Sequence, residues 1–332
     1  MLELIQRARA RVAHALGEAV EVISCYEAGR DGFWLDRLLS EHAICNHVID
    51  AASIHVSRRA RRAKTDRLDA ETLVRVLMAY CRGERKACSM VRVPSVEEED
   101  AKRQTRERDR LVTARTGHVN RIKGLLMMQG IRDINPMRSD FPVRLSSVRT
   151  GDGRMIGPGL LAEVLREWER LRIVISMVKA IENARDASMS QEAVLRSPEA
   201  KIQLLQKLRG VGPAFATVLT REVFYRSFDN RRQLGSYIGL APTPFNSGSM
   251  RRDQGISRAG NARARSTAIE LAWLWLRHQP SSSLSHWYYS RVGELIGRIR
   301  KIAIVALARK LVIALWRYLE TGLIPTGAAF KG

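Results

Sequence analysis

Residues 20–49 read VEVISCYEAGRDGFWLDRLLSEHAICNHVI, and this stretch decides the fold class of the N-terminal part. Residues 20–26 are rich in β-branched residues and lead into a glycine-containing turn, which predicts a strand. Residues 33–42 place apolar side chains at helical spacing, and residues 44–49 predict a second strand. After a basic loop, Thr65 can cap a further helix that runs through Leu77. This order predicts part of an α/β sheet domain, although two strands are too few for an independent sheet.

The middle of the chain changes to long, charged helical segments. Residues 96–100 read VEEED and bring negative charge to a first helical turn, where the helix dipole favours it. Proline and glycine gather between residues 135 and 159, which predicts a loop between two helices. We therefore expect three parts, which are an α/β domain over 1–92, a helical coiled-coil arm over 93–206 and a mostly helical domain over 207–332.

The charge balance of the chain points to a polyanionic partner. The 332 residues carry a net charge of +22, yet 45% of them are hydrophobic, so we expect a folded and strongly basic protein. Residues 207–332 hold 20 Lys and Arg against 6 Asp and Glu. Because binding to phosphates releases counterions, nucleic acid is the favoured partner, ahead of an acidic membrane surface or an acidic protein.

The sequence also argues against a membrane-spanning or secreted protein. It has no stretch of about 18 uncharged apolar residues, and residues 1–15 lack the apolar core and cleavage site of a signal peptide. The cysteines form no C-x-x-C pair and stand at Cys25, Cys45, Cys81 and Cys88. We expect a cytoplasmic protein without a zinc knuckle or a disulfide framework.

Three carboxylates form the first candidate site. Glu27 ends the first predicted strand, and Asp66 and Asp69 start a helix at a spacing that places both on one face. Carboxylates gathered in this way can hold a pair of Mg²⁺ ions that activate a nucleophile and stabilise a leaving oxygen. Alternatively, the two aspartates only satisfy the helix dipole and pair with nearby arginines. Those arginines are Arg61, Arg62 and Arg67.

A glycine turn forms the second candidate site. Residues 208–214 read LRGVGPA and lead into an apolar helix. This pattern is typical of a helix-hairpin-helix, in which backbone N–H groups at Gly210 and Gly212 reach a DNA phosphate. An ordinary turn between two helices explains the same residues equally well.

A serine-containing loop forms the third candidate site. Residues 241–252 read APTPFNSGSMRR, and residues 255–265 continue as GISRAGNARAR. A serine exposed beside guanidinium groups that clamp a phosphate can attack a phosphodiester covalently. The alternative is a phosphate-binding or flexible loop without a nucleophile.

Aromatic residues further along the chain either stack on bases or belong to the core, and the core is the favoured interpretation. They are Trp273, Trp275, Trp287, Tyr288 and Tyr289.

The order of these motifs resembles a known family. The motifs that occur in the order of this family are CYEAG at 25–29, KTDRLDA at 64–70, GVGP at 210–213, GLAP at 239–242, NSG at 246–248 and ISRAGN at 256–261. The ordered set covers nearly the whole chain and resembles the DEDD-type transposases of bacterial insertion sequences. The studied members of that family are RNA-guided recombinases that use a bridge RNA.

The resemblance implies an N-terminal RuvC-like (RNase H-like) domain, a coiled-coil arm and a C-terminal transposase domain. Glu27, Asp66 and Asp69 match the glutamate and the last two aspartates of a Mg²⁺-binding quartet. Ser247 matches the nucleophile that links to DNA, ahead of its rivals Ser249 and Ser257. The residues that would bind phosphate near the attacked bond are Arg251, Arg252, Arg258, Arg263 and Arg265.

The sequence departs from the family pattern at its N-terminus. The first aspartate of the quartet normally lies on a strand well upstream of the glutamate, and residues 1–20 offer no such residue. The nearby acids Glu3, Glu18 and Glu21 are poor substitutes. This departure predicts an incomplete RuvC-like domain in an N-terminally shortened chain.

The leading hypothesis is an insertion-sequence transposase that cuts and rejoins DNA through a covalent serine–DNA intermediate. It would use Mg²⁺ and a guide RNA, associate with the nucleoid, and work as a homodimer or homotetramer joined through the arm. One alternative is a catalytically inactive, nucleic-acid-binding remnant of such a transposase. Another is a metal-dependent junction nuclease in which water replaces the serine.

Overall fold

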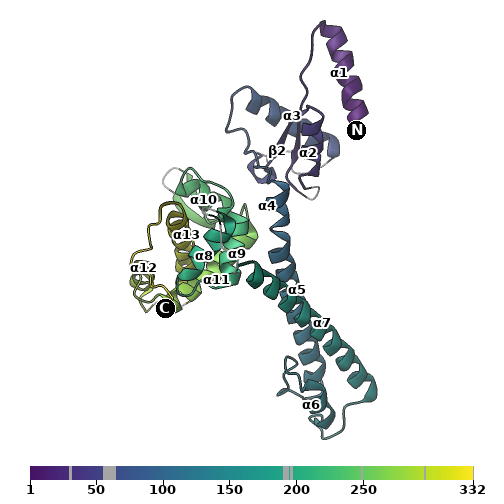
Figure 1. Ribbon diagram of the computed structural model, residues 1–332, viewed down its shortest axis with the longest axis vertical. Coiled ribbons are helices and arrows are strands. Elements are labelled where there is room, and N and C mark those ends of the chain that lie inside the picture. The colour runs from purple at the N-terminus through teal and green to yellow at the C-terminus, as the bar shows by residue number, and fades with distance from the viewer. Residues whose placement is uncertain are drawn as a thin grey trace. The chain divides into compact units, whose positions relative to one another are not determined.

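The computed structural model describes residues 1–29, 32–54, 65–189, 194, 197–247, 250–294 and 297–331. For residues 52, 244–247 and 250–254 it describes the backbone alone. The chain divides into two compact units, Met1–Glu97 and Glu98–Gly332, and Figure 1 labels most of their helices. Among the described residues, no helix is both long and apolar enough to cross a membrane.

The first unit is the small α/β part that the sequence predicts. Its two strands are parallel, with Ile23 opposite Cys45 and Glu27 opposite Ile49. The described part of this unit has no strand upstream of β1, since the preceding element is a helix. The elements are α1 (Leu2–Leu16), β1 (Ile23–Glu27), α2 (Trp34–Glu41), β2 (Cys45–Ile49), η1 (Ala51–Ser53) and α3 (Asp66–Cys81).

Local chemistry explains where α3 begins and where it packs. The Thr65 Oγ1 accepts a hydrogen bond from the Leu68 backbone N–H at 3.3 Å, which confirms Thr65 as the N-cap. The Cys25 thiol of β1 lies 3.9 Å from the Leu73 carbonyl oxygen, so α3 lies against β1. Val48 of β2 and Leu77 of α3 are buried in this unit.

The cysteines of this unit differ in burial. Burial, together with nearby Cys88 and Cys81, raises the pKa of the Cys25 thiol to about 11. Burial also raises the pKa of Cys88, whereas Cys45 and Cys81 are exposed. The thiolate is the reactive form, and a raised pKa leaves less of it at neutral pH.

We therefore expect iodoacetamide at pH 8 to modify Cys25 about 100-fold more slowly than an ordinary exposed thiol of the chain. Peptide mass spectrometry of timed samples measures this, with Cys45 as the internal control and a denatured sample as the reference. Equal rates at Cys25 and Cys45 in the folded protein would contradict the burial of Cys25.

The second unit begins with a pair of long helices. α5 (Arg103–Met127) and α7 (Pro158–Met189) pack against each other, and the short α6 (Phe141–Ser147) lies in the Pro/Gly-rich connection. The preceding helix α4 (Val96–Asp100) runs across the division between the units. Apolar residues of the pair form their own core, which includes Ile122, Leu126, Phe141, Leu145, Val164 and Leu171.

A buried acid sits in the interface between the two long helices. The Glu167 carboxylate of α7 accepts hydrogen bonds from His118 Nδ1 and Arg121 Nη1, each at 2.7 Å, and from Arg170 Nη1 at 2.8 Å. Only 3% of this side chain is exposed. An acid that must keep these partners fixes the register of α5 against α7, because a shifted pairing would bury an unpaired charge.

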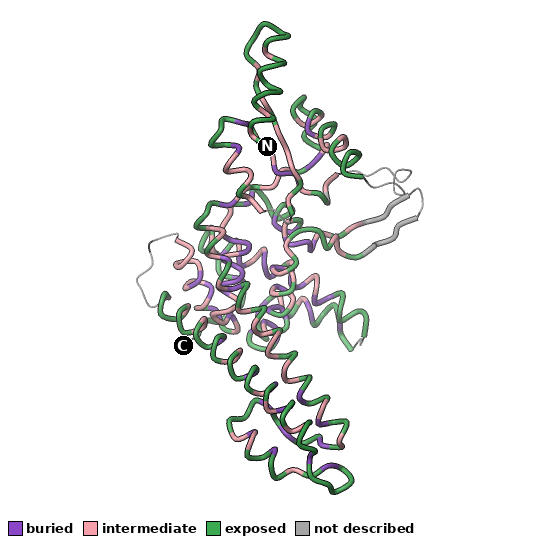
Figure 2. Tube along the Cα trace, turned by 90° about the vertical axis from the view of Figure 1, so that its right-hand side faces the viewer, coloured by how far each residue is buried: buried purple, intermediate pink, exposed green. Residues whose placement is uncertain are grey.

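The remaining helices share one larger core, and Figure 2 shows buried residues gathered there. The core begins at Ile202 and Leu205 and includes the fully buried Trp275. The elements are α8 (Pro198–Lys207), α9 (Pro213–Leu219), the π-helical turn η3 (Thr220–Phe224), α10 (Arg231–Tyr237), β3 (Pro242–Ser247), β4 (Met250–Ile256), α11 (Ala262–His278), α12 (Ser283–Val292) and α13 (Arg298–Thr321).

The serine-containing segment, which we expected to be a loop, instead contains the antiparallel hairpin of β3 and β4. Its prolines hid this pattern, since proline weakens a strand prediction. The register is irregular between Pro242 and Pro244. A two-stranded ribbon tolerates proline at such an irregularity, because the missing N–H is not needed there.

Candidate functional site

The hairpin places Ser247 at its tip. Ser247 is the last residue of β3 and lies opposite Met250, the first residue of β4. Arg251 is opposite Asn246, and Arg252 is opposite Phe245. The backbone thus brings the candidate serine and two arginines together, while their side chains lie outside the described part. The rival Ser249 lies in the turn, which is outside the described residues.

The base of the hairpin is fixed to the end of α10 by backbone hydrogen bonds. Ser257 N–H donates to the Ala241 carbonyl at 2.9 Å, and Arg258 N–H donates to the Gly239 carbonyl at 3.2 Å. Asn261 N–H donates to the Tyr237 carbonyl at 2.9 Å. The hairpin therefore projects from a rigid support, which is what a site needs if it is to hold a reacting group in place.

Two glycines make this close approach possible. Gly239 has φ +67°, and a Cβ there would lie 2.2 Å from the Ala259 carbonyl oxygen. Gly260 has φ +90°, and a Cβ there would lie 2.3 Å from the Tyr237 carbonyl oxygen. Both positions therefore require glycine, for conformation and for space. This explains the motifs GLAP and SRAGN in structural terms.

A buried carboxylate lies beneath the hairpin base. Glu222, on η3, has a side chain that is only 1% exposed. Arg106 of α5 donates to it twice, from Nε to Oε1 at 2.8 Å and from Nη2 to Oε2 at 3.0 Å. Asn261 donates from Nδ2 to Oε2 at 3.0 Å, and Tyr237 donates from its hydroxyl to the Glu222 carbonyl oxygen at 2.9 Å. Glu222 thus joins the start of α5 to the hairpin base.

Asn261 connects this carboxylate to the next helix. Its Oδ1 accepts a hydrogen bond from the Ala264 N–H at 3.0 Å and so caps the N-terminus of α11. Its amide nitrogen donates to Glu222 Oε2, so one side chain links Glu222 to the start of α11.

Hydrogen bonding decides the charge state of Glu222. Burial alone would raise the pKa of its carboxyl, but the hydrogen bonds from Arg106 and Asn261 outweigh this effect. The pKa of Glu222 therefore lies below its usual value. The carboxylate is ionised at neutral pH and forms a charge-assisted, bidentate pair with Arg106.

The three described arginine side chains of the phosphate-binding set have different surroundings. Arg258 is exposed and has φ +57°, an uncommon conformation for a residue with a side chain. Arg265 donates from Nη1 to the Arg258 carbonyl oxygen at 2.9 Å and supports that turn. Arg263 is 18% exposed, contacts Asp109 Oδ2 of α5 at 2.7 Å and donates to the Thr105 carbonyl oxygen. In this structure Arg263 binds the start of α5, while Arg258 faces solvent.

In the glycine turn, the backbone conformation and the available space require glycine at position 210 but not at position 212. Gly210 has φ +82°, and a Cβ there would lie 2.9 Å from the Cβ of His278. Gly212 caps α9 and has open space around its Cα. Backbone pairing with the C-terminal tail holds the turn, since Arg209 N–H donates to the Ala329 carbonyl at 3.0 Å.

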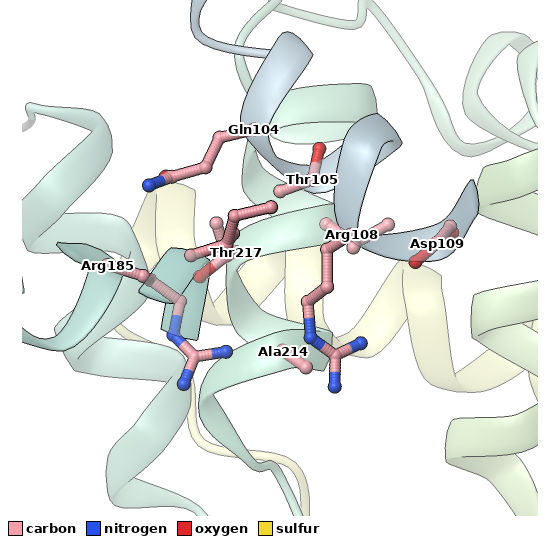
Figure 3. A pocket seen from close by; sticks show the side chains of 9 residues that line it. Gln104, Thr105, Arg108, Asp109, Arg185, Ala214 and Thr217 are labelled. Carbon is pink, nitrogen blue, oxygen red and sulfur yellow. The ribbon is translucent and has the colours of Figure 1, made fainter. Parts of the chain in front are cut away.

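The helix after the glycine turn packs against the start of α5. A small cavity of about 20 Å³ lies between α5, α7 and α9. Figure 3 shows the guanidinium groups of Arg108 and Arg185 on either side of Ala214. Arg108 donates from Nε to Glu182 Oε1 of α7 at 2.7 Å, so it links the two long helices.

The three carboxylates of the first unit are exposed. Glu27 ends β1, and Asp66 and Asp69 occupy the first turn of α3. The described residues show no pairing of Asp66 or Asp69 with Arg67, whose Nε lies 3.1 Å from Glu71 Oε1. The other arginines named for that pairing, Arg61 and Arg62, lie outside the described residues.

The donor chemistry of these carboxylates suits Mg²⁺, which prefers oxygen ligands. β1 and α3 are in contact at Cys25 and Leu73. Glu27 follows Cys25 by two residues on β1, and Asp69 precedes Leu73 by one turn of α3. Within the described ranges, however, no group of three or more His, Cys, Asp or Glu side chains is arranged to hold a metal ion.

Comparison with known proteins gives the class and then the family. A family model described as Transposase IS116/IS110/IS902 family matches residues 202–287, which include Glu222 and the hairpin. The chain is 50% identical over 335 residues to "Putative transposase y4rJ" of Sinorhizobium fredii, covering 99% of this chain and 84% of that protein. It is 30% identical over 278 residues to the transposase for insertion sequence element IS1111A of Coxiella burnetii, covering 80% of this chain and 69% of that protein. These relatives define an insertion-sequence transposase, a class that acts on DNA. The chain belongs to the IS116/IS110/IS902 family of transposases.

Sequence reasoning missed Glu222 and its partner Arg106. A signal was present, because Glu222 stands in the largely apolar run FATVLTREVF at 215–224. An acid in such a run is buried in the folded chain and needs a partner. The partner lies 116 residues away in sequence, which no local pattern can reveal.

Proposed function

We propose that this transposase cuts and rejoins DNA through a covalent bond between Ser247 and a DNA phosphate. The observation that supports this proposal is the position of Ser247 at the tip of a hairpin with a rigid base, beside two arginines. Hydroxyl nucleophiles need such positioning, since correct placement contributes much of the rate of a group transfer.

The chemistry balances without an external energy source. Ser247 Oγ forms a bond to phosphorus while the bond to one strand end breaks, and the serine proton passes to the released strand hydroxyl. A strand hydroxyl then attacks the phosphoserine, a new phosphodiester forms, and Ser247 regains a proton. Arg251, Arg252 and Arg258 would hold the phosphate and stabilise the negative charge of the transition state.

The carboxylates of the first unit would hold Mg²⁺ in the proposed RuvC-like domain. Glu27, Asp66 and Asp69 supply oxygen ligands that no other described side chain uses. When bound, Mg²⁺ would supply positive charge that offsets the charge of a nucleic-acid phosphate.

Further partners belong to the same proposal. The excess of positive charge in the chain suits DNA at the element ends and the target together with a guide RNA, in the cytoplasm at the nucleoid. Gly210 and Gly212 would contact a DNA phosphate through their backbone N–H groups. The arm would join two copies, and Ile173 and Met177 on α7 are 55% and 48% exposed, as such a contact requires.

One observation favours a second candidate, the inactive nucleic-acid-binding remnant. The described residues gather no group of carboxylates able to hold a metal ion. A protein without that site would still bind nucleic acid through its basic C-terminal helices but would form no covalent adduct.

The experiment that separates the two candidates is an adduct assay. The purified protein is incubated with Mg²⁺, the candidate guide RNA and end-labelled element DNA, and the products are run on a denaturing gel. A labelled band that shifts with the protein and disappears on proteolysis supports the recombinase. DNA binding without any adduct supports the remnant, and cleavage without an adduct supports the junction nuclease.

The arginines at the hairpin tip make a separate prediction. We expect replacement of both Arg251 and Arg252 by alanine to weaken DNA binding and to lower the salt slope by about 1 for each lost phosphate contact. Fluorescence anisotropy at several salt concentrations measures the slope. An unchanged slope would show that both guanidinium groups point away from the DNA.

A further inference from the structure

A second basic site lies on the C-terminal helices. A groove of about 280 Å³ is bordered by one face of α13, the first residues of α10 and α12, and the segment 323–326. Ile313 and Ala314 contribute to its apolar wall. Its charged lining residues are Arg231, Lys310 and Arg317. The labels in Figure 1 show where α10, α12 and α13 lie.

The groove has positive charge without a compensating acid. None of its described lining residues is a carboxylate, and none of its three cations is ion-paired in the part of the chain that the structure describes. Other cations of this unit are used internally, for example Arg221, which contacts Glu199 at 2.5 Å. Uncompensated charges that converge from two helices attract an anion to the space between them.

The positions of the cations suit a repeating anion. Lys310 and Arg317 are seven residues apart on one helix, so they are separated by about 10 Å along α13 on the same side. Lys310 Nζ lies 4.6 Å from the ring centroid of Trp287, and this cation–π contact restrains the ammonium group. Arg231 comes from α10, a different helix, so the three charges are not in one row.

We infer that this groove binds the phosphodiester backbone of a nucleic-acid strand. Basic grooves that follow a backbone are the usual means of holding a single strand without reading its sequence. The groove and the hairpin are connected through α10, since Arg231 begins this helix and its last residue, Tyr237, supports the hairpin base. A strand in the groove is thereby held within one short helix of the proposed reaction site. The inference does not depend on serine chemistry.

Strand binding is tested with the full chain carrying Arg231→Gln, Lys310→Gln and Arg317→Gln together. A matched control carries Arg144→Gln, Arg166→Gln and Lys179→Gln, which remove the same charge from exposed positions of the helical arm. Circular dichroism first checks that both triple variants are folded. Fluorescence anisotropy then measures binding of labelled dT20 and U20 at several salt concentrations.

We expect the groove variant to bind at least about tenfold more weakly at 0.1 M salt, with a salt slope lower by about 2, because each phosphate contact on a single strand contributes about 0.7. The control should keep the parent slope. A loss limited to U20 identifies RNA as the occupant, and a loss limited to dT20 identifies DNA. Equal losses in both triple variants, or none in the groove variant, would overturn the inference. The serine proposal is judged separately by the adduct assay.

Discussion

We expect Ser247→Ala to abolish the covalent protein–DNA adduct while leaving DNA affinity within about twofold of the parent. Removal of the hydroxyl takes away the only atom that could form the bond in the proposed step, and loss of a nucleophile commonly costs about 10³-fold or more in rate. The hairpin backbone is unaffected, because a terminal strand position accepts alanine as well as serine. A nicked substrate that traps the adduct, resolved on a denaturing gel, measures the loss.

Ser257→Ala is the matched control for this prediction. Ser257 contributes its backbone N–H to the hairpin base, a bond that alanine keeps, so this variant should form the adduct at the parent rate. An adduct that persists in Ser247→Ala and is lost in Ser249→Ala would move the nucleophile to the neighbouring serine. Strand cleavage that survives Ser247→Ala and disappears in Asp66→Ala would support the junction nuclease.

Local patterns predicted the secondary structure of the first unit well. Alternating strand and helix signals located β1, α2 and β2 to within a few residues, and the capping role of Thr65 was correct. These features depend on neighbours in sequence, such as the hydrogen bond from the Leu68 N–H to the Thr65 hydroxyl. The parallel pairing of the two strands also follows from the intervening helix.

The hairpin and its support were harder to predict, for physical reasons. Prolines at 242 and 244 hide the strand signal, and the register irregularity that accommodates them depends on the partner strand. The need for glycine at 239 and 260 arises only when the hairpin base meets the end of α10. Neighbouring residues in the sequence could not predict the role of Arg263 either, since its partner Asp109 lies on α5, far away along the chain.

The family resemblance and the structure contribute different parts of the site. The motifs at 239–242 and 256–261 were recognised as family features, while the structure gives their function as the support of the hairpin. The resemblance assigned phosphate binding to five arginines as a set. The geometry separates this set, because Arg265 supports a turn and Arg263 binds α5, whereas Arg258 is exposed.

The second large effect is expected at Glu222. Glu222→Gln should lower the free energy of unfolding of the second unit by about 2–3 kcal/mol, because it leaves Arg106 without its charged partner. The loss is smaller than for a fully buried pair, since the Arg106 side chain is 51% exposed. For a unit of this size the melting temperature should fall by about 5–10 °C at pH 7. Differential scanning calorimetry measures this change.

The pH dependence of the same variant identifies the charge as the cause. The pKa of Glu222 is lowered in the folded chain, so its contribution to stability is present above the unfolded pKa and is lost as the pH falls through the folded pKa. The difference between parent and Glu222→Gln should therefore be full at pH 7 and shrink below about pH 4. A difference that stays constant as the pH falls from 7 to about 2 would assign the effect to packing instead of charge.

A neighbouring ion pair provides the control for Glu222, and the hairpin provides the functional measurement. Glu199 pairs with Arg221, and its side chain is 37% exposed. Glu199→Gln should therefore lower the free energy of unfolding by less than about 1 kcal/mol.

If Glu222 positions the hairpin through Asn261, hydrogen exchange of the hairpin amides should rise in Glu222→Gln and stay unchanged in Glu199→Gln. Adduct formation should then fall in the first variant at temperatures where both remain folded, because a loosely held serine reaches the phosphate less often. A destabilised Glu222→Gln with parent-like exchange in the hairpin would limit Glu222 to joining α5 to the C-terminal helices.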